Sequence, residues 1–427
     1  MHFEPNGEQQ QLADALRRWI GRDYGAEARR AIVHSEAGVS PAAWATMVEL
    51  GLTALPVAEE HGGFGGDAFA MFGVMQELGR GLVVEPYMAT VLGAEFLRLG
   101  GGHGALLERV AAGELKLACA LGERQARHDA FDIATRAEAT DAPGGSYRLH
   151  GDKRVVLHGA QADVLVVSAR GNGGGQGIDG VSLFAVPRDS AGLRITGYRT
   201  LDGLRAANVV LDGVVVGPDA LIGRAGEGGA ILDAALDYGA GLLCAEAVGA
   251  MQALFDTTLE YLKTRQQFGA PIGKFQALQH RMADMAIHLE QARSMALLAA
   301  LTLARTRDIG VGVDGGVDCG VDSGVDSAVD SGVDSSAGTA VGSAARSPAG
   351  GDAQARRRAV SAAKYRVGQA ARFIGQGAVQ LHGGMGVTDE LPAAHYFKRL
   401  ALIELTLGDM DHHLERFMAQ SRFTEAA

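Results

Sequence analysis

Two short stretches near the carboxyl end of the chain carry residue types that suit an anionic, phosphate-bearing ligand. The first contains Arg265 and Phe268, and the second contains Gln380, Gly383 and Gly384. An arginine presents a planar fork of donors that matches a pyrophosphate, and glycines let backbone N–H groups approach an anion closely. An aromatic ring offers a flat apolar face, and a glutamine amide both donates and accepts. These residue types suit a phosphate-bearing ligand.

Each of these residues also has a simpler interpretation when taken singly. An arginine before a turn is usually a solvated charge, and a glycine pair after a helix is usually a helix cap. A metal site at His412 and His413 has less support than a cofactor site. The two histidines are adjacent rather than one helical turn apart, so they do not share one face of a helix. The three cysteines have no CxxC spacing, so neither a zinc site nor a disulfide framework is predicted.

Composition narrows the class of protein. A chain of 427 residues is longer than one compact core usually takes, so we expect two or three domains. The net charge of -11 argues against nucleic acid as the main partner. No apolar run reaches the roughly 20 residues that a membrane-spanning helix needs, and the charged amphipathic N-terminus lacks the order of a signal peptide. We therefore expect a cytoplasmic protein without a membrane span.

Periodicity divides the chain into three domains. Residues 1–112 carry apolar residues at helical spacing, and Ser40 followed by proline is a helix start signal. Residues 113–225 consist of short Val, Ile and Leu runs between Gly, Asp and Pro turns, which is typical of an antiparallel β-barrel or sandwich. The glycine-rich segment 171–180 lacks a following helix and predicts a hairpin loop rather than a phosphate loop.

The third domain, residues 226–427, predicts an antiparallel four-helix bundle. Its helices are expected at 231–263, 276–307, 356–381 and 393–407. An insertion at 308–352 repeats Val-Asp every four residues and is rich in Gly and Ser, so we expect disorder there. The regular aspartates also raise the hypothesis of a calcium-binding site. This hypothesis has less support than disorder, because the period of the repeat differs from that of calcium-binding β-rolls.

The order of these domains and two long motifs resemble the acyl-CoA dehydrogenase family. The motifs are RQQFGAPIGKFQ at 265–276 and QLHGGMG at 380–386, the latter followed by Glu390 and Pro392. The segments LGLTALPVAEEHGGFGG, VVLHGA and GDMDHHL look most like the small subunit of pimeloyl-CoA-type dehydrogenases. The resemblance covers nearly the whole chain apart from the insertion.

The resemblance implies a fold, a cofactor and partners. The fold would be an N-terminal helical domain, a middle β-domain and a C-terminal four-helix bundle. The cofactor would be FAD, with Arg265, Phe268, Gln380, Gly383 and Gly384 reaching across an interface to the FAD of a neighbouring subunit. The substrate would be an acyl-CoA, the electron acceptor a flavoprotein, and the assembly a homo-oligomer or a complex with a dehydrogenase large subunit.

The chain departs from the family where the chemistry takes place. In the family a glutamate removes the α-proton of the thioester. Its usual position is Leu407 here, and its alternative position falls at or next to Gly239 and Ala240. A hydroxyl that contacts the flavin has become Leu157, and a neighbouring aromatic has become Val155.

These losses lead to three hypotheses. The first is a subunit that lacks its own base and completes the FAD site of a partner, acting on acyl-CoA and perhaps on dicarboxylyl-CoA thioesters. The second is a self-sufficient homo-oligomer that uses Asp409 or Glu404 as the base. The third is a flavin-free binding or scaffolding protein of the same fold. We assign no catalytic residue and no metal ligand.

Overall fold

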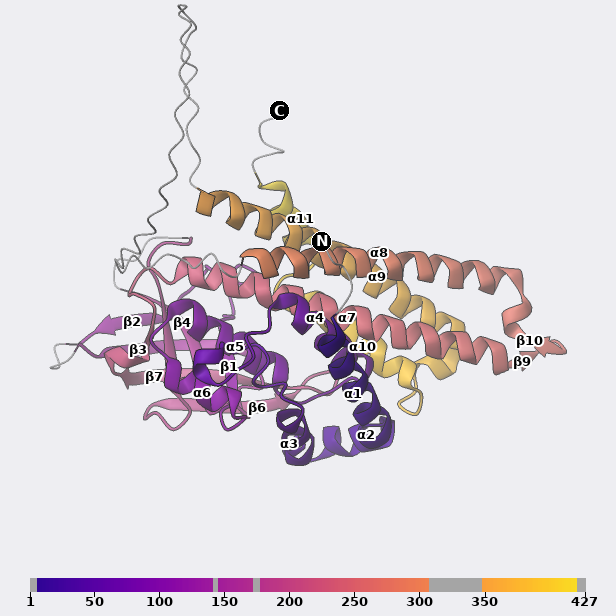
Figure 1. Cartoon of the computed structure of the whole chain (residues 1–427), viewed down its shortest axis with the longest axis horizontal. Coiled ribbons are helices and arrows are strands. Elements are labelled where there is room, and N and C mark those ends of the chain that lie inside the picture. The colour runs from indigo at the N-terminus through magenta and orange to yellow at the C-terminus, as the bar shows by residue number, and fades with distance from the viewer. Residues whose placement is uncertain (1–5, 141–144, 172–176, 307–347, 421–427) are drawn as a thin grey trace, which may run out of the picture.

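The computed structural model describes residues 6–140, 145–171, 177–306 and 348–420. Figure 1 shows the sheet at one end of the molecule and the long C-terminal helices extending away from it to the other end. The N-terminal helices lie against the middle of this arrangement. Among the described helices, no segment has both the length and the apolar character that crossing a bilayer requires.

The N-terminal part is helical, as the sequence predicts. Ser40 caps its helix by accepting from the Ala43 N–H at 3.2 Å, with Pro41 in the first turn. The α4 backbone packs directly on α7, because a Cβ on Gly79 would lie 2.1 Å from the Glu246 carbonyl oxygen. The helices are α1 (Gly7–Asp23), α2 (Ala26–His34), α3 (Pro41–Glu49), α4 (Ala68–Arg80), α5 (Tyr87–Gly100) and α6 (Gly104–Ala111).

The middle part is one eight-stranded sheet in the order β6-β7-β3-β2-β4-β5-β8, with β1 paired to β4. The expectation of a purely antiparallel domain is wrong at two pairs, since β1 and β2 each pair with β4 in parallel. A long connection rather than a hairpin separates these strands in the chain, and this permits a parallel pairing. The strands are β1 (Leu117–Ala120), β2 (Arg136–Ala139), β3 (Tyr147–Leu157), β4 (Val164–Arg170), β5 (Val181–Pro187), β6 (Leu193–Arg199), β7 (Arg205–Val216) and β8 (Leu221–Ile222).

The C-terminal part contains the four expected long helices, with clear differences at the ends of two. The third begins within the predicted insertion, and the fourth ends before Leu407. A further short helix follows, which the sequence analysis missed. The helices are α7 (Gly229–Thr264), α8 (Gln276–Thr306), α9 (Pro348–His382), α10 (Pro392–Leu405) and α11 (Met410–Met418). A hairpin of β9 (Gln266–Gln267) and β10 (Ala270–Pro271) joins α7 to α8.

Parts of two predicted segments lie outside the described residues. For the insertion predicted at 308–352, residues 308–347 lie outside them, whereas 348–352 form the start of α9. In the predicted loop at 171–180, residues 172–176 lie outside them, and the flanking strands β4 and β5 pair antiparallel as a hairpin requires.

Candidate functional site

A cavity of about 700 Å³ lies where the N-terminal helices, the sheet and the C-terminal helices meet. This volume is ordinary for a small-molecule site. Much of its wall is apolar and is drawn from all three regions. These apolar residues include Met75, Leu78, Met88, Leu92, Leu121, Leu157, Leu236, Leu243, Leu402, Leu405 and Leu407. The cavity therefore suits an extended, largely apolar ligand.

The two positions at which the family resemblance places a carboxylate base face each other beside this cavity. A Cβ added to Gly239 of α7 would lie 2.7 Å from Leu407 Cδ1 and 3.1 Å from Leu92 Cδ1. No side chain at position 239 fits while Leu407 keeps its place. An apolar side chain thus fills the space in which a proton acceptor is expected.

The turn that carries Leu407 is held from two sides. Leu407 has a left-handed backbone with φ of 56°, and its carbonyl oxygen lies 2.9 Å from His413 Nε2. Burial lowers the pKa of His413 to about 2. The imidazole is therefore neutral, and its Nε2–H donates to the Leu407 carbonyl. From α9, buried Lys364 Nζ donates to the carbonyl oxygens of Ile403, Glu404 and Gly408 at 2.8–2.9 Å.

The carboxylate of Asp409, the first alternative base, caps α11. Its Oδ1 accepts from the His412 N–H at 2.9 Å, and its Oδ2 lies 3.1 Å from His128 Nε2 and 3.4 Å from Arg127 Nη2. Burial raises the pKa of Asp409, but the His412 N–H and the His128 and Arg127 side chains outweigh it and hold the pKa below its ordinary value. This aspartate is thus poorly suited to accept a proton.

Glu404, the second alternative base, is also engaged. It is 8% exposed, and its Oε1 accepts from the Met410 N–H at 3.2 Å. Neither Glu404 nor Asp409 belongs to the cavity wall in the described part of the chain.

Most carboxylates that line the cavity are in ion pairs, whereas Glu85 accepts from the Tyr24 hydroxyl and the Ser40 N–H, and burial raises its pKa to about 7. On one side, buried Arg399 binds Glu246 through two bonds of 2.6 and 2.8 Å and Asp202 at 2.9 Å. This cluster joins α10, α7 and the turn between β6 and β7.

A second cluster of ion pairs lies farther toward the start of α7. Asp233 and Asp237 pair with Arg356, Arg357 and Arg416 at distances of 2.5–2.9 Å. The cluster ties α7 to α9 and α11. These carboxylates hold helices together and are compensated by neighbouring arginines.

The sheet side of the cavity rests on a buried lysine. Lys153 Nζ lies 2.7 Å from Glu123 Oε1 and 3.0 Å from Ser168 Oγ, in the interior of the β-domain. Glu123 in turn accepts from the Ala134 N–H at 2.8 Å, which fixes the loop between β1 and β2. Leu157, which stands where the family has a hydroxyl, forms part of the cavity wall.

The residues predicted to bind a cofactor lie at the ends of the bundle helices, away from this cavity. Arg265, Gln380, Gly383 and Gly384 are exposed, and Phe268 is 90% exposed with φ of 53°. A Cβ on Gly383 or Gly384 would meet nothing within 4 Å, so the backbone there is open to a ligand.

The two motifs that carry these residues lie side by side. Tyr261, one turn before Arg265 on α7, stacks on the ring of His382 at the end of α9 with a centroid separation of 4.4 Å. The Tyr261 hydroxyl also reaches the His382 carbonyl oxygen at 3.5 Å. The structure thus brings the arginine and the glycine pair to one end of the bundle.

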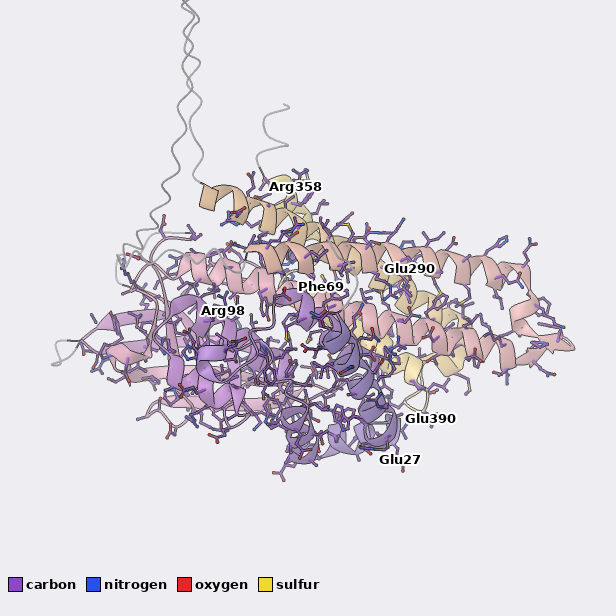
Figure 2. The ribbon with its side chains drawn as sticks, viewed as in Figure 1. Glu27, Phe69, Arg98, Glu290, Arg358 and Glu390 are labelled. Carbon is purple, nitrogen blue, oxygen red and sulfur yellow. The ribbon has the colours of Figure 1, made fainter. Side chains whose placement is uncertain are left out.

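The loop after the glycine pair rests on the N-terminal helices. Arg30 of α2 donates to the Asp389 carbonyl oxygen at 3.1 Å. Figure 2 labels Glu390 of this loop and Glu27 of α2 on the same side of the molecule in this view. Contacts with α7 on one side and with α2 on the other therefore hold the segment that carries the glycine pair.

Comparison with known families agrees with this architecture. Family models of acyl-CoA dehydrogenase domains match residues 6–104 (N-terminal domain), 118–214 (middle domain) and 226–314 with 336–421 (C-terminal domain). This chain belongs to the acyl-CoA dehydrogenase family. It is accordingly an oxidoreductase of a flavoprotein family, and the predicted order of helical, β and helical domains is confirmed.

Similar proteins support the same conclusion. The probable acyl-CoA dehydrogenase YngJ of Bacillus subtilis is 33% identical over 310 residues, which cover 70% of this chain and 80% of that protein. The ChsE4-ChsE5 complex from Mycobacterium tuberculosis gives a TM-score of 0.77 at 22% identity over 97% of both chains. The FAD complex of PigA gives 0.79 at 23% identity over 99% of this chain and 100% of that chain. These two structures share the fold.

Several residues of the site escaped sequence reasoning. Lys364 holds the Leu407 turn and Arg399 closes one end of the cavity, and both act on groups distant in sequence, whereas His413 bonds to Leu407 only six residues earlier. A lysine within an apolar helical stretch was a usable signal for Lys364, since a buried lysine requires partners.

Proposed function

We propose that this chain is a subunit of an FAD-dependent acyl-CoA dehydrogenase that completes the FAD site of a partner subunit and has no catalytic base of its own. In this family bound FAD accepts the hydride that leaves the β-carbon of the acyl thioester. The partner would be a large subunit that carries the base, and reduced flavin would pass its electrons to an electron-accepting flavoprotein.

The packing of Leu407 against Gly239 carries this proposal. A base must come within hydrogen-bond reach of the proton that it removes. Both family positions for that base are apolar here, and a side chain at Gly239 would require Leu407 to move, because a Cβ there would lie 2.7 Å from Leu407 Cδ1. The cavity-lining Glu246, Asp233 and Asp237 are paired with arginines.

The exposed end of the bundle supports the cofactor role. Arg265 would pair with the pyrophosphate of the partner's FAD, the backbone at Gly383 and Gly384 would receive its oxygens, and Phe268 would cover the adenosine. Exposed donors and open backbone fit such an anion.

The chain's own cavity fits a flavin less well. At Leu157, where the family has a hydroxyl that contacts the flavin, the cavity wall offers an apolar side chain. A structural relative, the ChsE4-ChsE5 complex, contains two different proteins, which supports a heteromeric arrangement. From the motif resemblance, dicarboxylyl-CoA thioesters are the first substrates to examine for the partner's site.

The proposal is tested by co-expressing this chain with a candidate large-subunit dehydrogenase and following reduction of a dye by acyl-CoA. We expect no turnover by this chain alone and turnover by the complex. Turnover should vanish when the partner's base is replaced by glutamine. Dehydrogenation by this chain alone would contradict the proposal and favour a self-sufficient homo-oligomer. A complex that binds no flavin would favour a scaffolding role.

A further inference from the structure

The loop between β1 and β2 forms part of the cavity wall. Its middle segment, residues 124–130, is named the strap, and residues 126–130 of the strap all line the cavity. The strap is thin, because Arg127 belongs to the cavity wall and yet has a side chain that is 78% exposed. A displacement of the strap would therefore open the cavity to solvent on the side of the sheet.

Both ends of the strap are fixed to the sheet. Just before it, buried Glu123 accepts from Thr135 Oγ1 and from Lys153 Nζ, each at 2.7 Å. Just after it, the carbonyl oxygen of Phe131 accepts from Arg170 of β4 at 2.8 Å. The strap is thus a short span between two firm attachments, and these attachments can serve as its hinges.

The middle of the strap is fastened to the C-terminal helices at one residue. Asp409, the N-cap of α11, places its Oδ2 at 3.1 Å from His128 Nε2 and at 3.4 Å from Arg127 Nη2. In the described part of the chain, every hydrogen bond and ion pair from the strap to these helices ends on this carboxylate. Asp409 is therefore the catch of the strap, in addition to its role as a helix cap.

Little besides this catch keeps the strap in place. Its apolar side chains are only two alanines, Ala126 and Ala130, so it buries little apolar area. The ion pair of Arg127 is largely exposed, and such pairs contribute little to stability. The backbone of Arg127 is left-handed with φ of 47°, which a residue other than glycine rarely adopts. Release of the catch would let this backbone relax, so local opening of the strap should have a low cost.

We propose that the strap is a lid of the cavity, which the contact of Arg127 and His128 with Asp409 holds closed and which opens when this contact breaks. The lid goes beyond the proposed function, because it does not depend on which subunit holds the flavin. Salt screens exposed charges and should therefore favour the open form.

The test measures how fast N-ethylmaleimide labels Cys119, which lies on β1 and lines the cavity. The full chain is labelled at pH 8, and peptide masses report each cysteine separately. The double variant Arg127→Ala/His128→Ala removes both strap side chains from the catch and should label Cys119 about fivefold faster than the unaltered chain. Cys244 of α7 is completely buried in the core and should show no change.

Two further variants separate the catch from other effects. Asp409→Asn keeps a good cap for α11 but removes the charge, so it should also speed labelling of Cys119 and gives a result even where the double variant fails to fold. Arg124→Ala is the matched control, because Arg124 is an exposed arginine of the same strap and makes no ion pair in the part of the chain that the structure describes. It should leave the labelling rate unchanged.

Hydrogen exchange distinguishes a moving strap from a loosened domain. The Asp129 N–H bonds within the strap to the Ala126 carbonyl oxygen at 2.8 Å, whereas the Thr135 N–H bonds at the hinge to Glu123 Oε1 at 3.1 Å. Exchange in the catch variants should become faster at Asp129 and stay unchanged at Thr135. Equal labelling of Cys119 in all four proteins would overturn the proposal. Faster exchange at Thr135 together with faster labelling of Cys244 would also overturn it, since the whole domain would then have loosened.

Discussion

A Cβ on Gly239 would come within 2.7 Å of Leu407 Cδ1. The two residues therefore form one packing unit across α7 and the turn after α10. Each stands where the family resemblance places an alternative base, and Leu407 in its present position excludes a side chain at Gly239. The loss of the base is thus a coupled feature of the packing, since restoring a side chain at Gly239 requires a change at Leu407.

Gly239→Ala and Leu407→Ala should be strongly coupled in stability. We expect Gly239→Ala alone to destabilise the chain by about 1 kcal/mol or more through the clash. In the Leu407→Ala background most of this cost should disappear, because only Leu92 at 3.1 Å still crowds the new methyl group and alanine favours a helix over glycine by about 1 kcal/mol. Urea unfolding of the four proteins measures this coupling, and additive effects would show that the two side chains do not touch.

Arg265→Ala should weaken FAD binding by the complex by about tenfold or more, because a charge-assisted hydrogen bond contributes about 1.5–3 kcal/mol. Arg265→Lys should recover only part of the affinity, since it cannot bind a pyrophosphate with two parallel bonds. Flavin fluorescence titration gives the affinities. Arg281→Ala, on an exposed position of α8, is the control, and an equal loss there would refute a specific role for Arg265.

Asp409→Asn should leave turnover by the complex unchanged, because the structure assigns this carboxylate to the cap of α11 rather than to proton transfer. Asparagine is also a good cap, so stability should change little, whereas Asp409→Ala should cost about 1 kcal/mol. Dye-coupled kinetics and thermal unfolding measure the two effects. A large loss of turnover in folded Asp409→Asn would favour the homo-oligomer hypothesis.

His413 and His158 should each reduce stability as the pH drops below about 6.5, against an opposing contribution from Glu85, whose pKa burial raises to about 7. The pKa of His413 is lowered to about 2 and that of His158 to about 4. The unfolded chain therefore takes up protons that the folded chain refuses, and each histidine removes about 1.4 kcal/mol per pH unit below its unfolded pKa, until the folded pKa is reached. Urea unfolding at pH 7.5 and 5.5 measures the slope. His158→Asn should flatten it by the share of one histidine, and an unaltered slope would place His158 in a solvated environment.

The fold could be anticipated where local pattern decides it, and less where distant contacts decide it. The start at Ser40 and the four long helices follow from capping and periodicity. The parallel pairing of β1 with β4 joins segments far apart in the chain. The spacing of apolar residues within each segment does not indicate such a pairing. Likewise, Lys364 and Arg399 act on α10 and α7 through tertiary contacts, so no nearby residue signals their roles. The end of α10 before Leu407 depends on that same Lys364.

The number of flavins per chain tests the central claim most directly. The purified complex should show a flavin absorption band that corresponds to one FAD for each pair of one partner subunit and one copy of this chain, and this chain alone should be colourless. Two flavins per pair, or a stoichiometric flavin in this chain alone, would contradict the account.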